Sequence, residues 1–509
     1  MASIVLGFEI HQPLRVKHFS GPSDGVHDGQ LTDHYFNNGL NKFVFDRAAH
    51  KCYYPTTRIL LEHIDTFKGQ KREFKCAFNM SGVWLEQCEK WQPDLLDLFK
   101  QVAKTKRAEF LGSTYFHSLA SMFKSHDEFK EQISLQNQAI KDLLGVKPTA
   151  FINTEMIYNN LIAKTVEDLG YKVIFTEGVE RILGWRSPNY VYARGPVSET
   201  DKPLDQRIKV LTRNYRLSDD VGYRFSSKHW NQWPLTAEKY SIWLSSTPGQ
   251  VITLFMDYET FGEHQPEDSG IFYFLKALPW KIFDWQNLDF ATPSEIADKY
   301  PALDQVDVHE QNTISWADME RDLSAWLGNS MQKMAFDEVE KLESLVKQNG
   351  QIHLRMWRLL QQSDLFYYMC TKWWQDGDVH KYFSPFATPH DAFVNVISGL
   401  SDVKVRLIKE IAVMNALKTK EKKELFDLNE LMKSLEARET TKILDSDKTI
   451  VKKAKKTKKM EKKKTVKEEV KENPTSVDFI LSENVEYPKV YVNVDNLAEI
   501  SDVLRKRLK

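Results

Sequence analysis

The sequence predicts an α/β fold followed by a bundle of helices. Between Met1 and about Phe290, short apolar runs alternate with helical stretches, and each run ends in polar residues. This pattern is typical of β/α units with buried parallel strands. From about Glu310 to Lys433 the strand-like runs disappear and long amphipathic segments replace them, which predicts helices packed on the β/α part. With 509 residues, the chain has room for several domains and a sizeable core.

Seven runs are predicted as strands because each is short and apolar enough to be buried on both faces. They are residues 4–10, 74–79, 109–112, 150–153, 173–176, 208–212 and 251–256. Helices are predicted where apolar residues recur at helical spacing. In the first part of the chain these are 94–104, 125–144 and 157–169, and in the second part 331–347, 351–370 and 390–418.

The C-terminal part has a different composition. Residues 451–473 contain eleven Lys and four Glu with no aromatic residue, which indicates a solvated linker. Two short β-like runs, 477–481 and 490–494, and a helix capped by Asp495 follow, too few residues for a core of their own. We therefore expect a barrel over 1–305, a helical bundle completing the cleft over 306–440, a Lys-rich linker over 441–475, and a β/α tail over 476–509 that docks elsewhere.

Composition excludes several classes of partner. The chain has 70 Lys and Arg against 71 Asp and Glu, so no broad attraction to nucleic acid or an anionic membrane is expected. The linker carries a charge of +7 (11 Lys minus 4 Glu), but it interleaves no aromatic or Arg residue for base stacking, which favours a soluble spacer over an RNA-binding run. No apolar run reaches the roughly 18 residues of a membrane span. The oligomeric state stays open.

The cysteines and the first residues indicate an intracellular protein. Cys52, Cys76, Cys88 and Cys370 form no C-x-x-C pair and lie near no H-E-x-x-H motif, so neither a disulfide framework nor a zinc signature is present. The opening residues lack a basic region and lead into polar residues, so they predict a strand and not a secretory signal. A cytoplasmic location with reduced thiols is expected.

Polar clusters follow four of the predicted strands. They are His11-Gln12-Pro13, 112–117, 153–156 and 257–264. In a parallel barrel the loops at the carboxyl ends of the strands converge, so the four clusters predict one site. Taken singly, most have a structural explanation: His11 could be a turn residue and Glu155 could cap the following helix. The last cluster, with three carboxylates, a His and two aromatics, is harder to explain without a function.

A pair of carboxylates from different strands suits glycoside chemistry. One carboxyl group carries a proton to the leaving oxygen, while the other, ionised, supports or attacks the anomeric carbon. Glu155 and Asp257 form such a pair. Aromatic platforms for sugar rings could come from several residues, although most Trp residues in proteins are core. The candidates are Tyr115, Phe116, Trp185, Trp230, Trp233, Tyr258, Phe261 and Trp316.

These segments, in this order, resemble the five sequence regions of glycoside hydrolase family 57. The fifth region is matched by 316–329, and the resemblance covers about residues 4–396. Within the family, residues 184–189 and 316–329 resemble the α-amylase group more than the branching enzymes or glucanotransferases. One departure is Leu365, within Ser363-Asp364-Leu365-Phe366-Tyr367-Tyr368, where related amylases usually have His. Any polar task of that His would be lost here.

The resemblance implies an incomplete (β/α)7 barrel with a helical bundle behind it. It also implies a retaining mechanism on α-glucans such as starch or glycogen, without a metal or an organic cofactor. By the matching motifs, Glu155 is expected to be the nucleophile and Asp257 the general acid/base. His11 and His117 are expected to hold the sugar being cleaved, and Trp316 to close the cleft. Further substrate contacts are expected from Gln12, Tyr115, Tyr258 and Phe261.

Three other functions are weighed against an α-1,4-glucan hydrolase of the amylase type. A 4-α-glucanotransferase would use the same carboxylates, because a covalent glycosyl-enzyme can pass its sugar to water or to another glucan. A metal-dependent carbohydrate deacetylase would need a clustered His/Asp set, and no His-x-x-x-His or Asp-Asp pair follows a predicted strand. A non-catalytic glucan-binding protein would be expected to have lost Glu155 or Asp257, and both are present.

Overall fold

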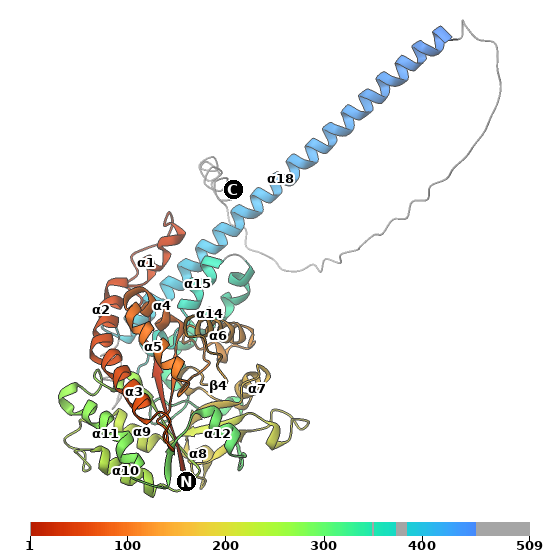
Figure 1. The fold of residues 1–509 in the computed structure, drawn as a ribbon. Helices are drawn as coiled ribbons and strands as arrows, with labels where there is room; N and C mark the ends of the chain where they lie inside the picture. The colour runs from red at the N-terminus through yellow and green to blue at the C-terminus, as the bar shows by residue number, and fades with distance from the viewer. Residues whose placement is uncertain (1, 349–350, 373–383, 455–509) are drawn as a thin grey trace, which may run out of the picture. The chain divides into compact units, whose positions relative to one another are not determined.

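The computed structural model describes residues 2–348, 351–372 and 384–454 (Figure 1). Met1–Glu421 form one compact unit, which contains the sheet and the helices around it, and Lys422–Lys509 form a second. None of the helices in the described ranges combines the length and the hydropathy needed to cross a membrane.

Seven parallel strands form a barrel in the first unit, and all seven correspond to predicted runs. β1 pairs with β2 and β8, β2 with β3, β4 with β5, β5 with β7, and β7 with β8. An isolated bridge between Gly112 and Phe151 joins the end of β3 to β4 and closes the ring. The strands are β1 (Ala2–Ile10), β2 (Cys76–Met80), β3 (Ala108–Phe110), β4 (Ala150–Phe151), β5 (Val173–Glu177), β7 (Lys209–Arg213) and β8 (Val251–Asp257).

The sequence did not predict three short strands. β6 (Val191–Arg194) pairs antiparallel with β7, β9 (Leu288–Phe290) pairs with β1, and β10 (Gln305–Val306) pairs with β6. Runs of two to four residues are too short to show a period of their own, so only the neighbouring strand makes them strands.

Helices cover the outside of the barrel and one of its ends. The predicted helices 94–104 and 125–144 are confirmed as α5 and α6. In the barrel part the helices are α1 (Leu31–Tyr35), α2 (Asn38–Ala48), α3 (Tyr54–Phe67), α4 (Gly82–Trp91), α5 (Pro93–Thr105), α6 (Asp127–Leu144), α7 (Asn160–Asp168), α8 (Glu180–Leu183), α9 (Tyr215–Gly222), α10 (Ala237–Ser246), α11 (Ile271–Phe283) and α12 (Pro293–Lys299). Beyond it lie α13 (Ser324–Leu327), α14 (Ser330–Gln348), α15 (Gln351–Leu359), α16 (Ser363–Tyr367) and α18 (Pro389–Ala454).

The single helix predicted over 351–370 is wrong, because the chain breaks between α15 and α16. The backbone there bonds to the loop after β3: Leu119 N–H donates to Gln361 O at 3.3 Å, and Ser363 N–H donates to His117 O at 2.9 Å. The Gln362 side chain accepts from Leu14 N–H at 2.8 Å. These contacts with distant residues replace the helical ladder, which helical spacing in the sequence cannot reveal.

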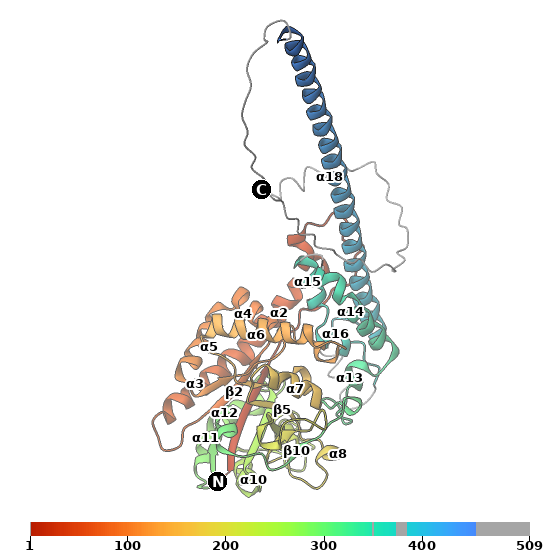
Figure 2. The same cartoon turned by 90° about the vertical axis from the view of Figure 1, so that its right-hand side faces the viewer.

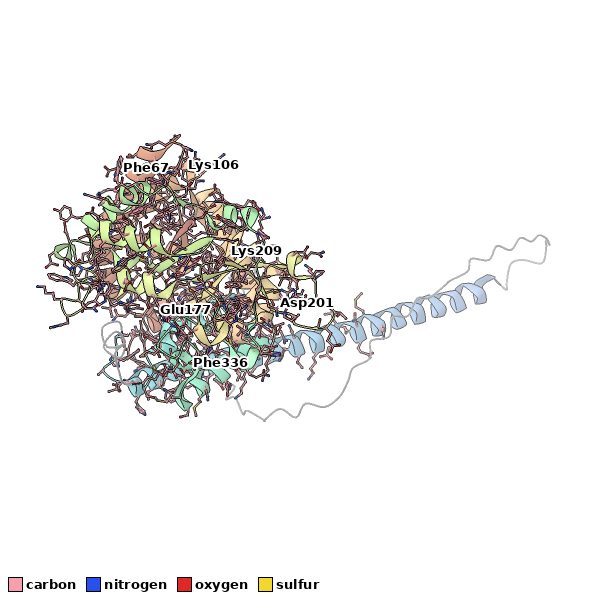
Figure 3. All side chains as sticks on the ribbon, turned by 90° about the horizontal axis from the view of Figure 1, so that it is seen from below. Phe67, Lys106, Glu177, Asp201, Lys209 and Phe336 are labelled. Carbon is pink, nitrogen blue, oxygen red and sulfur yellow. The ribbon has the colours of Figure 1, made fainter. Side chains whose placement is uncertain are left out.

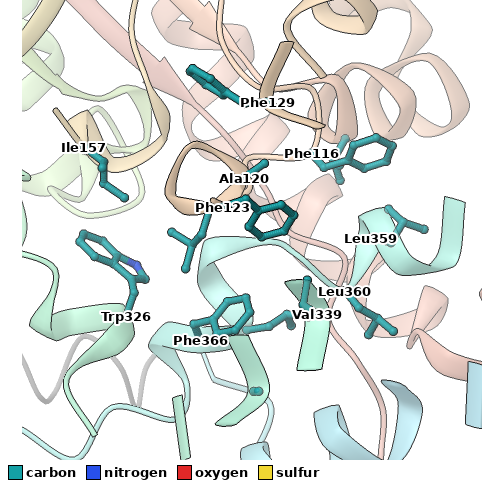
Figure 4. Close-up of a cluster of buried hydrophobic side chains, with 14 of the residues drawn as sticks. Phe116, Ala120, Phe123, Phe129, Ile157, Trp326, Val339, Leu359, Leu360 and Phe366 are labelled. Carbon is teal, nitrogen blue, oxygen red and sulfur yellow. The ribbon is translucent and has the colours of Figure 1, made fainter. Parts of the chain in front are cut away.

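The barrel and the helices that follow it share one hydrophobic core. Figure 4 shows Phe123 and Phe129, from the barrel part, in the same cluster as Trp326, Val339 and Phe366. Figures 1 and 2 place α14 and α15 at the end of the barrel toward which β1 runs from the N-terminus. The carboxyl ends of the strands therefore face these helices.

Of the predicted C-terminal part, only the beginning of the linker can be compared with the structure. Helix α18 continues to Ala454, so the first residues of the predicted linker 441–475 are helical. The rest of that linker, the two β-like runs and the tail helix lie outside the described residues. The boundaries proposed for the four domains stay predictions.

Candidate active site

A cavity of about 190 Å³ lies at the carboxyl ends of the strands, between the barrel and the helices. Six of the nine site residues predicted from the sequence line this cavity. Because these residues come from loops far apart in the chain, the convergence predicted for the barrel end is confirmed. The six are His11, Gln12, His117, Glu155, Asp257 and Trp316.

The Glu155 carboxylate is held from both sides by the helical part of the chain. The indole Nε1–H of Trp316 donates to Oε2 at 2.8 Å, and the Ser363 hydroxyl donates to Oε1 at 2.8 Å. His117 Nε2 lies 3.4 Å from Oε1. Each carboxylate oxygen thus has its own donor, which fixes the orientation of the expected nucleophile.

The backbone of Glu155 is strained. Its φ of 58° lies in the left-handed region, inside the 3₁₀ turn Thr154–Met156, and Met156 follows with a φ of 51°. Non-glycine residues in this region are uncommon, and such strain persists only where neighbouring contacts enforce it. Here Trp316 N–H donates to Glu155 O at 3.2 Å. Glu155 does not cap α7, because the Asn159 side chain does so by accepting from Ile162 N–H at 2.9 Å.

Non-glycine residues with positive φ angles in the described chain cluster around this cavity. Of the six non-glycine residues concerned, only Lys106 lies elsewhere. His117 has a φ of 48°, and Asp318 and Arg321, which flank the Trp316 turn, have φ angles of 54° and 49°. Strained residues gather at functional sites, so this concentration supports the assignment of the cavity.

Asp257 ends β8 next to a second buried carboxyl group. The strand register pairs Asp257 with Glu9 of β1, and Glu9 in turn with Asn79 of β2. Burial, and then the charge of Glu155, raise the pKa of Asp257 to about 7. Burial also raises the pKa of Glu9 to about 7, although the Asn79 amide donates to both of its oxygens at 2.8 and 2.7 Å. Asp257 can therefore carry a proton near neutral pH.

His11 and His117 stack and have opposite charge preferences. Their ring centroids are 4.0 Å apart with planes at 22°. Burial, followed by the charge of His117, lowers the pKa of His11 to about 4. For His117, burial favours the neutral ring, but Glu155 and Glu9 outweigh it and raise its pKa to about 9. At neutral pH the pair is thus one neutral imidazole and one imidazolium.

The tautomer of His11 follows from its partners. Asp364 Oδ2 lies 3.0 Å from Nε2, and because a carboxylate only accepts, Nε2 carries the hydrogen. Nδ1 lies 2.6 Å from the Ser81 hydroxyl, which accepts from Trp84 N–H at 3.1 Å and so has its own hydrogen free to donate. His11 is thereby fixed in one orientation at the end of β1.

Three of the predicted substrate contacts need correction. Tyr115, Tyr258 and Phe261 are not among the lining residues. The hydroxyl of Tyr115 donates to Glu86 at 2.7 Å, while Tyr258 and Phe261 pack on Phe8 in the core with 0 % and 2 % exposure. Burial of the Tyr258 and Phe261 rings between β1 and the surrounding helices removes apolar surface from water. For these rings, packing in the core is therefore favoured over a place in the polar cavity.

The sequence analysis did not single out several residues that line the cavity. Glu9 could have been recognised from the sequence, because burying a carboxylate inside an apolar strand costs free energy unless the carboxylate has a partner. Glu259, whose pKa is raised to about 8 by burial and then by Asp257, lay within a segment already noted. Asp364 lay within the stretch 363–368 quoted above, but nothing in the sequence indicated its contact with His11, which is 353 positions away. Leu365, the departure noted above, is fully buried in the core shared by barrel and helices.

A buried ionic cluster supports the Trp316 turn. Arg213 binds Glu177 at 2.9 Å and Asp219 at 2.5 Å, and Arg321 binds the same Glu177 oxygen at 2.6 Å. The Arg213 guanidinium lies 5.7 Å from the centre of the Trp316 ring, and Arg321 donates to Trp316 O at 3.2 Å. In the view of Figure 3, Glu177 is labelled between Lys209 of β7 and Phe336 of α14. The cluster thus ties the donor of Glu155 to the barrel.

A glycine in β1 contributes to the same support. A Cβ on Gly7 would lie 2.3 Å from a ring carbon of Phe255, so only glycine leaves room for that ring. The Phe255 ring in turn lies 6.2 Å from that of Trp316.

Among the described residues, no group of three or more His, Cys, Asp and Glu side chains is arranged to hold a metal ion.

Replacing Arg213 by Met should lower the free energy of unfolding by about 3–5 kcal/mol, because it leaves Glu177 and Asp219 short of a buried partner. The matched control is Arg216→Met, which removes an exposed ion pair with Glu180 and should leave the free energy of unfolding nearly unchanged. Denaturant titration of both variants measures the difference. Equal free energies of unfolding for the two variants would show that the buried ionic cluster does not stabilise the fold.

Comparisons with known proteins agree with this site. Residues 5–309 match the family model of glycosyl hydrolase family 57. A protein of Methanocaldococcus jannaschii named "Putative alpha-amylase" is 44% identical over 418 residues, covering 80% of this chain and 85% of its own. The 4-alpha-glucanotransferase of Thermococcus litoralis is 22% identical over 47% of this chain, which spans only 32% of that protein.

Among solved structures, the fold is similar to that of a branching enzyme from Pyrococcus horikoshii. The TM-score is 0.55 at 13% identity, with 78% of this chain and 88% of the other covered. At that identity the likeness concerns the fold, which includes a barrel and a helical bundle. The family match and the archaeal relative together show that the chain belongs to glycosyl hydrolase family 57.

Proposed function

We propose that this protein is a retaining α-1,4-glucan hydrolase of the α-amylase type, with Glu155 as nucleophile and Asp257 as general acid/base. The observation that carries the proposal is the contrast between the two carboxyl groups in one cavity. Glu155 accepts a hydrogen bond on each oxygen, whereas burial raises the pKa of Asp257 to about 7. Two carboxyl groups in such different environments can divide the roles of nucleophile and acid.

In the first step, Asp257 gives its proton to the glycosidic oxygen while Glu155 attacks the anomeric carbon. The bond from that carbon to the leaving glucan breaks, and a glycosyl ester forms on Glu155. In the second step, the Asp257 carboxylate takes a proton from water, whose oxygen attacks the anomeric carbon and releases Glu155. Two inversions leave the product in the α configuration.

The neighbouring residues support these steps by position and charge. Trp316 and Ser363 aim the Glu155 carboxylate, and His117 adds a positive charge 3.4 Å from it. His11 and Gln12 line the cavity: the Gln12 amide can bind sugar hydroxyls, whereas His11, with both ring nitrogens bonded to Ser81 and Asp364, offers the face of its ring. The identity to the archaeal relative supports an α-amylase over the other activities of the family.

A short maltooligosaccharide tests the proposal directly. Smaller sugars alone, released first as α anomers and followed by proton NMR, are expected for a retaining hydrolase. Longer sugars appearing beside the smaller ones would assign a 4-α-glucanotransferase, which uses the same covalent intermediate. Products released as β anomers would remove the roles assigned to Glu155 and Asp257.

Substitution of each carboxyl group should separate the two roles. Glu155→Gln should abolish turnover on every substrate, because no nucleophile remains. Asp257→Asn should keep the first step on a nitrophenyl maltooligoside, since nitrophenolate leaves without a proton, and azide should release the trapped sugar as the α-glycosyl azide. Steady-state rates and product analysis measure both effects.

The matched control for these substitutions is Glu263→Gln. Glu263 follows Asp257 in the same segment but binds Arg47 at 2.6 Å and does not line the cavity. It should therefore keep the wild-type rate. Near-normal turnover by Glu155→Gln would refute the assignment.

The pH dependence should report on Asp257. Its pKa is raised, so the protonated acid is available below about pH 7 and is lost as the pH rises through that value. We expect kcat/KM on maltooligosaccharides to fall about tenfold per pH unit above pH 7. With a nitrophenyl maltooligoside the fall should be much weaker. A plateau that extends to pH 9 for both substrates would contradict this role.

A further inference from the structure

A groove beside the cavity contains Asp257 but not Glu155. Glu155, His11 and His117 line the cavity alone, and the residues that the groove shares with the cavity are Tyr223, Asp257, His264, Trp316 and Asp318. The acid protonates the oxygen between the sugar held by the nucleophile and the departing chain. If Glu155 and Asp257 act as proposed above, the departing part of the glucan therefore leaves the cavity through this groove.

A second, shallower groove lies on α9, α10 and the loop between them. Arg224 lines both, so the two grooves adjoin at this side chain. The second groove is lined by Arg216, Asp220, Arg224, Trp230, Gln232 and Trp243. Tyr223, which is 64% exposed, stands where the first groove meets the cavity. A polymer that enters the first groove is thus led toward Trp230.

The second groove combines aromatic rings with fixed polar groups. The rings of Trp230 and Trp243 lie 6.1 Å apart at 78°. The Arg224 guanidinium lies 5.8 Å from the centre of the Trp230 ring and is held by Asp220 at 2.7 Å. Indole rings pack against the apolar faces of sugars, while carboxylate, guanidinium and amide groups bind their hydroxyls. This composition suits a neutral carbohydrate better than an apolar ligand.

We propose that the groove around Trp230 and Trp243 binds the leaving-group side of a long α-glucan, beyond the sugars that contact Asp257. It gives the enzyme a preference for polymer over short oligosaccharides, because only a long chain reaches both the cavity and this groove. Trp230 is then a stacking platform, one of the candidate roles that its residue type allows.

The test compares long and short substrates in the full chain. Trp230→Ala should lower the ratio of kcat/KM for soluble starch to kcat/KM for a nitrophenyl maltotrioside about five- to tenfold, the loss expected for one aromatic platform. Trp230→Phe should recover most of this ratio. The control is Trp280→Ala, since Trp280 is 52% exposed and lines neither groove, and it should keep the wild-type ratio. A ratio for Trp230→Ala equal to that of Trp280→Ala overturns the proposal.

Two further measurements keep the result decisive. Because Trp230 packs partly on the core, Gln232→Ala serves where Trp230→Ala does not fold, and it should lower the same ratio about two- to threefold. Retardation in a native gel that contains glycogen measures binding without turnover. Retardation that Trp230→Ala weakens, in an enzyme that cleaves no α-glucan, would refute the proposed function but support the groove. Wild-type cleavage with no variant effect in either assay would refute the groove alone.

Discussion

The two hydrogen bonds from the helical part to the Glu155 carboxylate are the interaction on which the site depends. Both neutral donors to Glu155, Trp316 and Ser363, come from beyond the last barrel strand. The same contact region interrupts the helical ladder before α16 and strains the Glu155 backbone. The shared hydrophobic core supplies the driving force for this arrangement, because packing of the helices on the barrel end brings the donors into place. A barrel without these helices would leave the Glu155 carboxylate without these two donors.

Crowding of carboxyl groups is the second constraint. Glu9, Asp257 and Glu259 lie near one another at the ends of β1 and β8, and burial raises the pKa of each. Three such groups cannot all ionise in a small cavity, so protons are shared among them near neutral pH. The imidazolium of His117 compensates part of the negative charge that remains. The strand register sets Asp257 beside Glu9, and the charge of Asp257 contributes to the raised pKa of Glu9, while burial and then Glu155 raise the pKa of Asp257 itself.

Substrate choice depends on features beyond Glu155 and Asp257. Family 57 membership fixes the class of chemistry, but two sequence relatives and a structure of similar fold carry names as different as alpha-amylase, 4-alpha-glucanotransferase and branching enzyme. The surroundings of Asp257 differ from those of Glu155, because Asp257 lines a groove of aromatic and charged residues, whereas Glu155 does not line it and contacts His117 and Ser363. That asymmetry distinguishes the two sides of the cavity.

The sequence by itself determined the seven barrel strands, most of the long helices and six of the residues around the cavity. Strand and helix periods are local properties, and residues that follow a parallel strand lie at the same barrel end wherever they occur in the chain. Tertiary structure alone decided which aromatic rings reach the cavity, since aromatic residues serve both in the core, as Tyr258 does, and beside Glu155, as Trp316 does. It also decided that Ser363 and Asp364 belong to the site. Their partners lie more than 200 positions away, and no local pattern encodes a contact formed only when the helices pack on the barrel.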